Sequence, residues 1–137
     1  MDDTKRILIV DDETSVLYVM QNSLRKLGSR YKVSTATDGN KALNLLRQRP
    51  FNLVITDYKM AGMDGLQLIE TIRRIRPETR VILITAYGND AVEAEARRLQ
   101  AYRFLTKPLE ISVFRQIVQE ALDDIAISRP GILILSD

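Results

Sequence analysis

Five short apolar runs alternate with amphipathic stretches along almost the whole chain. The runs read as strands, with 33–36 the weaker one, and lie at 7–10, 33–36, 53–56, 81–85 and 103–106. In the amphipathic stretches, apolar side chains recur at the helical period, and these stretches lie at 14–27, 38–49, 66–75, 90–99 and 113–125. Five consecutive strand–helix units predict a parallel sheet with helices on both faces. The near-continuous apolar strands agree, because strands covered on both faces are apolar throughout.

Residues that begin and end helices support these limits. Gly28 follows the first predicted helix and suits a C-cap, and Asp38 can cap the start of the second. That helix must end before Pro50, because the residue before a proline disfavours the helical conformation. The third helix is expected to stop at Pro77 in the same way.

The chain contains no cysteine and no histidine. This excludes disulfides, thiolate nucleophiles, imidazole bases and sites for soft metals. Any bound metal must therefore sit among oxygen ligands, which favours Mg²⁺ or Ca²⁺. The formal charge of +2 is nearly balanced, so we expect no direct binding of nucleic acid. No apolar run is long enough to span a bilayer, and the polar start shows no secretory signal, so we expect a cytoplasmic location.

Polar side chains stand where four of the predicted strands end. In an open parallel sheet the carboxyl ends of the strands share one edge, and ligands bind there. We therefore expect these side chains to converge on one crevice. They are Asp11, Asp12, Glu13, Asp57, Thr85 and Lys107.

These residue types together suit phosphoryl chemistry. Clustered carboxylates repel one another unless a cation neutralises them. Mg²⁺ usually takes one or two carboxylates in a site completed by phosphate oxygens and water. A further carboxylate is then free to attack phosphorus as a nucleophile. Lys107 and the Thr85 hydroxyl would stabilise the charge on the transferring phosphoryl group.

Four segments carry this chemistry, at 6–13, 57–65, 84–88 and 104–108. Their sequences are RILIVDDE, DYKMAGMDG, ITAYG and FLTKP. In this order and spacing, the chain resembles the receiver family of two-component response regulators. The resemblance implies a flavodoxin-like, doubly wound sheet with strand order 2-1-3-4-5 and five helices. The length of 137 residues allows one such domain, and we expect it to occupy 5–127.

The resemblance also implies roles for the acidic residues. Asp57 would accept the phosphoryl group from a sensor histidine kinase, a phosphotransfer protein or a small donor such as acetyl phosphate. Asp12 and Asp57 would bind Mg²⁺ through their side chains, and Lys59 through its backbone carbonyl. Asp11 would act through a metal-bound water. The chain would be a switch, not an enzyme, catalysing only its own phosphorylation and dephosphorylation.

Four further residues receive roles in the same way. Lys107 would pair with the phosphate, and Thr85 would move to hydrogen-bond it. Phe104 matches the aromatic switch position, which turns inward when Thr85 moves. The peptide bond from Lys107 to Pro108 is expected to be cis, a rare conformation that usually serves a specific turn.

Some residues depart from the family pattern. Gln100 stands where a glycine is common before the fifth strand, and such a position often needs positive φ. The switch aromatic Phe104 has no hydroxyl, so it cannot form a side-chain hydrogen bond in either of its two rotamers. Lys59 and Tyr87 are both large and flank the expected phosphate, where the resemblance implies control of acyl-phosphate hydrolysis. Gly62 and Gly65 indicate a turn and a helix start. A glycine-rich phosphate-binding loop is not expected there, because no GxxxxGK pattern is present.

Two alternative functions deserve comparison. A phosphohydrolase of haloacid-dehalogenase type also uses an aspartate, Mg²⁺ and a lysine, but it needs a second aspartate two residues after the nucleophile. Lys59 occupies that place after Asp57. A degenerate receiver that serves only for docking would have lost some of the acidic residues, Thr85 or Lys107, and all are present.

The tail and the output are separate questions. A Pro-Gly break precedes four large apolar residues at 132–135, and we expect 128–137 to be a linker or the start of a following element. Segments 57–65 and 84–88 are similar to those of receivers attached to ATPase-driven transcription activators. A possible output domain beyond Asp137 and a possible homodimer complete the expected partners, with no membrane among them.

Overall fold

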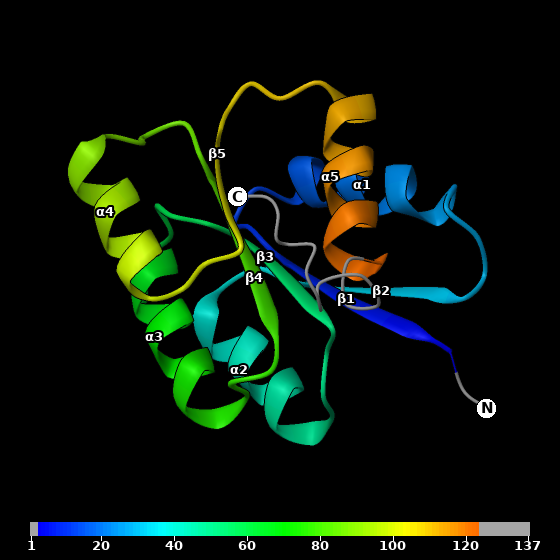
Figure 1. Ribbon diagram of the computed structural model, residues 1–137, viewed down its shortest axis with the longest axis horizontal. Helices are drawn as coiled ribbons and strands as arrows, with labels where there is room; N and C mark the ends of the chain where they lie inside the picture. Colours follow the sequence, from blue (N-terminus) through cyan, green and yellow to red (C-terminus); the bar gives the residue numbers. More distant parts are fainter. Residues whose placement is uncertain (1–2, 124–137) are drawn as a thin grey trace, which may run out of the picture.

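The computed structural model describes residues 3–123, with five strands and five helices alternating along them (Figure 1). The strands are β1 (Lys5–Val10), β2 (Tyr31–Ala36), β3 (Leu53–Asp57), β4 (Arg80–Thr85) and β5 (Arg103–Thr106). The helices are α1 (Thr14–Arg25), α2 (Gly39–Gln48), α3 (Gly65–Ile75), α4 (Asp90–Arg98) and α5 (Ile111–Asp123). All five predicted strand–helix units are therefore present.

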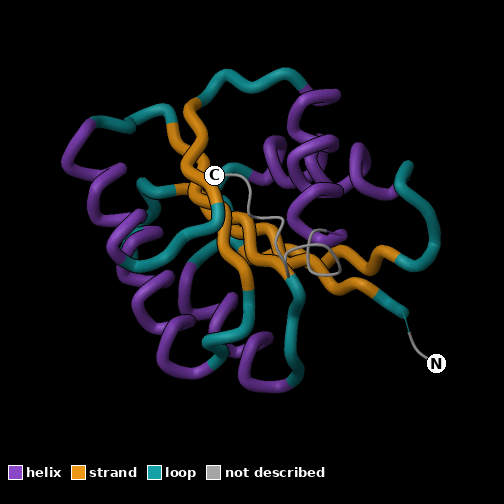
Figure 2. The backbone as a smooth tube through the Cα atoms, in the orientation of Figure 1, coloured by secondary structure: helices purple, strands orange, loops and turns teal. Residues whose placement is uncertain are grey.

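The strands form one parallel sheet in the order β2-β1-β3-β4-β5. Helices α1 and α5 cover one face of the sheet, and α2, α3 and α4 cover the other (Figures 1 and 2). The predicted doubly wound architecture and its strand order are confirmed. The order reverses between β1 and β3, which places the switch point of the topology at the ends of these two strands.

Alternate residues of the strands enter two separate cores. Leu8, Val54 and Leu83 pack toward α2, α3 and α4, whereas Ile9 and Ile55 pack toward α1 and α5. Successive side chains of a strand point to opposite faces of the sheet, so the inner strands β1, β3 and β4 are apolar at most positions, whereas the edge strands β2 and β5 are more polar and more exposed. This explains the unbroken apolar runs from which the sheet was predicted.

Several predicted limits need correction. The first helix ends at Arg25, two residues earlier than expected, and its C-cap is Lys26. Gly28 lies beyond the cap with φ of 124°, and its N–H donates to the Arg25 carbonyl. The last turn is tightened by hydrogen bonds from each N–H to the carbonyl three residues earlier, so the helix ends before the glycine. Strand β2 begins earlier than predicted, because Tyr31 pairs in register with Lys5 of β1.

Other predicted details are confirmed. The Asp38 carboxylate accepts a hydrogen bond from the Lys41 N–H at 2.8 Å and caps α2, which ends before Pro50. Gln100 adopts φ of 65°, a conformation that costs a residue with a side chain about 1 kcal/mol. The peptide bond from Lys107 to Pro108 is cis. The apolar run 132–135 and the expected linker 128–137 lie outside the described residues.

No helix within residues 3–123 combines the length and apolar character needed to cross a membrane. The described part of the chain forms one sheet between two helical layers. Its site must be sought at the carboxyl edge of the strands.

Candidate functional site

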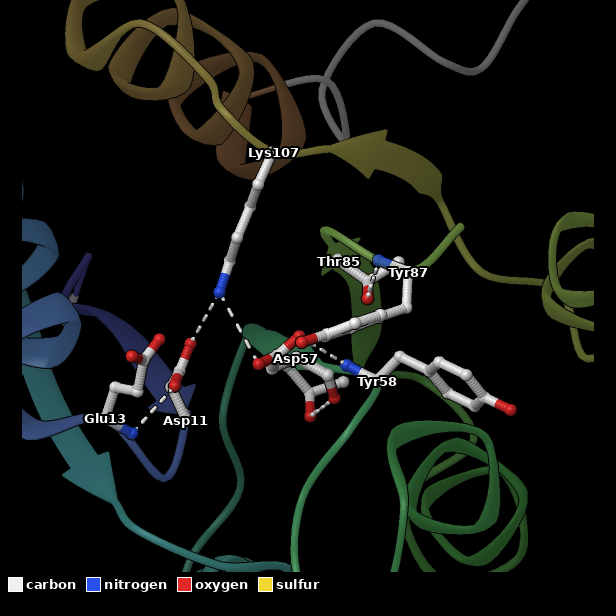
Figure 3. Close-up of polar contacts among 8 residues, drawn as sticks. Asp11, Glu13, Asp57, Tyr58, Thr85, Tyr87 and Lys107 are labelled. Atoms are coloured by element: carbon white, nitrogen blue, oxygen red, sulfur yellow. Dashed lines mark hydrogen bonds and ion pairs between the residues drawn. The ribbon is translucent and has the colours of Figure 1, made fainter. Parts of the chain in front are cut away.

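Three carboxylates meet at the carboxyl ends of the neighbouring strands β1 and β3 (Figure 3 shows Asp11 and Asp57). Val10 of β1 pairs in register with Thr56 of β3, so the residues that follow them are neighbours. Oxygen atoms of Asp11, Asp12 and Asp57 all lie within 4.8 Å of one another. The structure therefore brings together the three aspartates that the sequence predicted.

The amine of Lys107 joins two of these carboxylates from the end of β5. Its Nζ lies 3.1 Å from Asp11 Oδ2 and 3.4 Å from Asp57 Oδ2. Figure 3 marks both contacts with dashed lines. The Lys107 backbone N–H donates to the Thr85 carbonyl at 2.9 Å, which fixes the start of the side chain. Burial lowers the pKa of Lys107, but its bonds to Asp11 and the charges of both aspartates outweigh burial and raise it. Lys107 is therefore a permanent positive charge in the site.

Asp57 is the last residue of β3 and is only 8% exposed. Its Oδ1 accepts a hydrogen bond from the Tyr58 N–H at 2.8 Å, and its Oδ2 faces Lys107. Burial raises the pKa of Asp57, and the charge of Asp11 adds to this effect. Lys107 and the Tyr58 N–H offset part of the rise. One oxygen is thus held by the backbone and the other is directed toward the lysine.

Asp11 and Asp12 differ in their surroundings. Asp11 is 2% exposed, and its Oδ1 accepts from the Glu13 N–H at 2.9 Å. Asp12 is exposed and borders a shallow cavity of about 370 Å³. Asp57 borders the same cavity, together with Glu13, Lys59, Met60 and Tyr87. Glu13 lines this cavity but is not one of the three clustered carboxylates.

Thr85 is fully buried at the end of β4. Its hydroxyl oxygen accepts a hydrogen bond from the Tyr87 N–H at 2.9 Å. Figure 3 marks this bond with a dashed line. The hydroxyl therefore contacts its own loop in this structure. Phe104, the predicted switch aromatic, is half-buried on β5 and packs against the core under α4.

Two of the side chains that line the cavity beside Asp57 contact each other. The amine of Lys59 lies 5.6 Å from the centre of the Tyr87 ring, a distance at which an ammonium is attracted to an aromatic face. Both residues are exposed, and the Tyr87 side chain is 61% accessible. The sequence predicted that they flank the site, but not that they contact each other.

Gly65 is a site residue whose role the sequence did not reveal. A β-carbon at this position would lie 2.3 Å from the backbone oxygen of Asp57, and the Gly65 N–H donates to the Tyr58 carbonyl at 2.8 Å. Only glycine allows this close approach beneath Asp57. One signal in the sequence could have pointed to this role. Gly65 is the first residue of α3, directly after the N-cap Asp64, and glycine is a poorer helix former than most residues.

The donor set fits a hard divalent cation. The three clustered groups are carboxylates, and hard cations such as Mg²⁺ and Ca²⁺ prefer oxygen ligands. Asp11 is buried while Asp12 is open to the cavity, so a cation could reach the cluster from one side. The cluster can therefore bind a metal ion.

Residues 7–119 match the family model described as "Response regulator receiver domain". That span includes every residue of the site described above. The chain belongs to this family. As a receiver domain, it is the signalling module of two-component response regulators, and the fold expected from the resemblance is the observed one.

Comparisons with individual proteins agree. The transcriptional regulatory protein ZraR of Escherichia coli O157:H7 is 36% identical over 116 residues, which are 85% of this chain and 26% of that protein. A CheY-like receiver domain protein from Methanospirillum hungatei superposes with a TM-score of 0.86 at 28% identity, covering 92% of this chain and 99% of that one.

A third similar structure is the beryllofluoride-activated NtrC4 receiver domain dimer. It has a TM-score of 0.82 at 30% identity and covers 88% of this chain and 98% of that one. The chain spans about a quarter of the length of the curated relatives it matches.

Proposed function

We propose that this receiver domain is a phosphorylation-dependent switch whose phosphoryl acceptor is Asp57. One observation carries the choice of residue. Within residues 3–123, Asp57 is the carboxylate that both contacts Lys107 and borders the open cavity. Asp11 contacts Lys107 but is buried away from the cavity, and Asp12 borders the cavity without an ion pair to Lys107.

The transfer step follows from this geometry. Asp57 Oδ2 attacks the phosphorus of the donor, and a bond from phosphorus to the acyl oxygen forms. The donor's own bond, P–N in a phosphohistidine or P–O in acetyl phosphate, breaks and its electron pair leaves with the donor. Lys107 stabilises the negative charge on the phosphoryl oxygens. The Tyr58 N–H holds the other carboxylate oxygen in place.

A magnesium ion would be held by Asp12, Asp57 and the backbone carbonyl of Lys59, with Asp11 acting through a metal-bound water. When bound, the ion neutralises the clustered carboxylates and the charge that builds on the phosphoryl group. Thr85 then turns its hydroxyl from the Tyr87 N–H to the new phosphoryl group, and Phe104 changes position with it. These residues together form the proposed switch.

The phosphoryl acceptor can be tested by mass. Acetyl phosphate with Mg²⁺ should add about 80 Da, one phosphoryl group, to the intact chain. The addition should be absent in Asp57→Asn and absent without a divalent ion. Asp38→Asn is the control, because asparagine also caps a helix well. Labelling that persists in Asp57→Asn, or a wild-type chain that is never labelled, would overturn the assignment.

The metal site can be tested separately from phosphorylation. Asp12→Asn removes one proposed ligand and one of three mutually repelling charges. Mg²⁺ affinity, measured by titration calorimetry, should fall at least tenfold, while the unfolding temperature in EDTA should rise slightly. An unchanged affinity would contradict the role of Asp12.

The wider setting is part of the same proposal. The similar protein ZraR is named a transcriptional regulator and is much longer than this chain. We infer a receiver at 5–127 that takes its phosphoryl group from a sensor histidine kinase or phosphotransfer protein in the cytoplasm. Residues 128–137 would lead to an output domain. Self-association is supported by the dimer of the similar NtrC4 receiver.

A further inference from the structure

The segment 58–64 connects β3 to α3 and carries Lys59, whose backbone carbonyl is a proposed metal ligand. Hydrogen bonds hold the segment at its two ends, where the Tyr58 and Asp64 N–H groups each donate to a side-chain oxygen at 2.8 Å. Between these ends, in the part of the chain that the structure describes, residues 59–63 form no hydrogen bond. The backbone that presents the Lys59 carbonyl is therefore held by side-chain packing.

Two methionines supply that packing. Met60 is 8% exposed and lies in the core formed with α2, α3 and α4. Met63 is half-buried and packs against the same core. Ala61 and Gly62, which lie between them, are exposed, and the φ of 79° at Gly62 lets the chain turn there. The two methionine side chains thus anchor the segment to the fold.

The Met63 side chain packs on Gly39, the first residue of α2. A β-carbon at position 39 would lie 2.8 Å from Sδ of Met63 and 3.1 Å from both its Cβ and its Cγ. Non-bonded carbon atoms make optimal contact at about 3.5–4.0 Å, so the methionine fills the space that a side chain at position 39 would need. Helices α2 and α3 lie side by side on one face of the sheet (Figure 1). The contact therefore joins the start of α2 to the segment that leads into α3.

Space, not backbone conformation, requires glycine at position 39. Within residues 3–123, the glycines with positive φ are Gly28 and Gly62, so alanine could adopt the backbone of Gly39. Turning the Met63 side chain to another rotamer would move Sδ but would leave Cβ in place, because Cβ is bonded to the backbone. A β-carbon at position 39 would therefore displace the backbone at Met63 as well as its side chain.

The segment 58–64 would yield to this overlap more readily than α2. The Asp38 carboxylate caps α2, and one face of the helix is buried against the sheet. Residues 59–63 have no hydrogen bond that resists a shift. Asp57 stays fixed at the end of β3, so a shift of the segment would move the Lys59 carbonyl relative to the clustered carboxylates.

We propose that Met63 is a positioning residue for the metal site. Its contact with Gly39 fixes the position from which segment 58–64 presents the Lys59 carbonyl to a cation in the aspartate cluster. Gly39 takes part because it has no side chain and leaves room for the methionine. This inference rests on the function proposed above, and it adds Met63 and Gly39 to the residues on which that function depends.

Magnesium affinity, measured by titration calorimetry, tests the role of Met63. Met63→Ala removes the anchor and Gly39→Ala displaces it, so each change should weaken Mg²⁺ binding roughly threefold or more. Met63→Leu keeps a side chain of similar volume and should remain close to wild type. Met20→Ala is the matched control, because Met20 is also half-buried but packs in the core on the opposite face of the sheet. It should lower stability without changing Mg²⁺ affinity.

Carbon-13 NMR of labelled methionine methyl groups follows the contact without any metal. The chain has four methionines, and the methyl group of Met20 serves as an internal reference. In EDTA, Gly39→Ala should shift the Met63 methyl signal and the backbone amide signals of 59–63, and should leave the Met20 signal in place. These shifts report the displacement of the segment directly.

A double-mutant cycle separates the contact from the separate effects of the two residues. Alanine is a better helix former than glycine, but in wild type the overlap with Met63 offsets this advantage. Gly39→Ala should therefore raise the unfolding temperature more in the Met63→Ala background than in wild type. Mg²⁺ affinity should not recover in the double variant, because the anchor is still absent. A contact that served only stability would leave Mg²⁺ affinity unchanged throughout.

The outcomes separate this inference from the proposed function. Mg²⁺ affinity that is unchanged in Met63→Ala and Gly39→Ala, but falls in Asp12→Asn, would overturn the role of Met63 and leave the metal site standing. Affinity that is unchanged in Asp12→Asn would overturn the metal site itself, and the role of Met63 with it. An equal effect of Gly39→Ala on the unfolding temperature in both backgrounds would show that the two residues do not act through their contact, and would also overturn the inference.

Discussion

Lys107 Nζ lies 3.1 Å from Asp11 Oδ2, an ion pair that joins residues 96 positions apart in the chain. The distance from the same amine to Asp57 is longer, at 3.4 Å. Lys107 is therefore shared between a buried carboxylate and the proposed acceptor. We therefore expect the lysine to contribute to the stability of the fold as well as to the proposed chemistry of the site.

Replacing Lys107 should reveal that structural contribution. Lys107→Met leaves the buried Asp11 without its ion-pair partner, so the free energy of unfolding in EDTA should fall by about 1–3 kcal/mol. Mg²⁺ should restore part of the loss, because a divalent cation replaces the missing charge. Urea denaturation with EDTA and with Mg²⁺ measures both effects. Lys32→Met, an exposed change on β2, is the control, and equal stabilities of the two variants would contradict the prediction.

The pH dependence of stability should report on Asp57. Burial and the charge of Asp11 raise the pKa of Asp57 above the ordinary value of 3.8. A carboxyl whose pKa is higher in the folded chain than in the unfolded chain destabilises the fold when it is ionised. At a pH low enough to protonate it in both the folded and the unfolded chain, it has no such effect. Asp57→Asn should therefore raise the unfolding temperature in EDTA at neutral pH. This increase in unfolding temperature should shrink as the pH falls through the raised pKa of Asp57 and vanish below 3.8. An increase that grows on acidification would refute the prediction.

The lifetime of the phosphorylated state should depend on Lys59 and Tyr87. The two side chains contact each other and line the cavity beside Asp57, where a hydrolytic water must approach in line with the acyl oxygen. We expect shielding to outweigh any help from the Lys59 charge. The double change to alanine should then shorten the lifetime roughly threefold or more. Mass spectrometry after donor removal measures the decay, and an unchanged or longer lifetime would show that access of water is not limiting.

The limit of the domain can be tested by truncation. Helix α5 already completes the fifth strand–helix unit, and residues 129–137 follow it. Deleting 129–137 should leave Mg²⁺ binding and phosphorylation intact, and should improve solubility or abolish any dimer that depends on the apolar run 132–135. Loss of several kcal/mol of stability would instead make the tail part of the core.

The sequence by itself predicted five strand–helix units in a doubly covered sheet and the gathering of polar side chains at one edge, whereas the strand order was implied by the resemblance to the receiver family. The period of the apolar residues indicated five strand–helix units, and both faces of each strand had to be covered. Because parallel strands end at one edge, Asp11, Asp57, Thr85 and Lys107 could be assigned to a common crevice. These conclusions depend on local periodicity and on a general property of parallel sheets, so one sequence was enough.

The tertiary structure alone decided which atoms meet within that crevice. The shorter ion pair of Lys107 to Asp11, the approach of Gly65 to the Asp57 carbonyl and the contact of Gly39 with Met63 have no counterpart in the sequence pattern. The early end of α1 at Arg25 was also missed. Each of these features depends on distances of a few ångströms, within a closing helical turn or between segments that are separate in the chain. Such distances are set by strand register, close packing and loop geometry, which act only once the chain has folded.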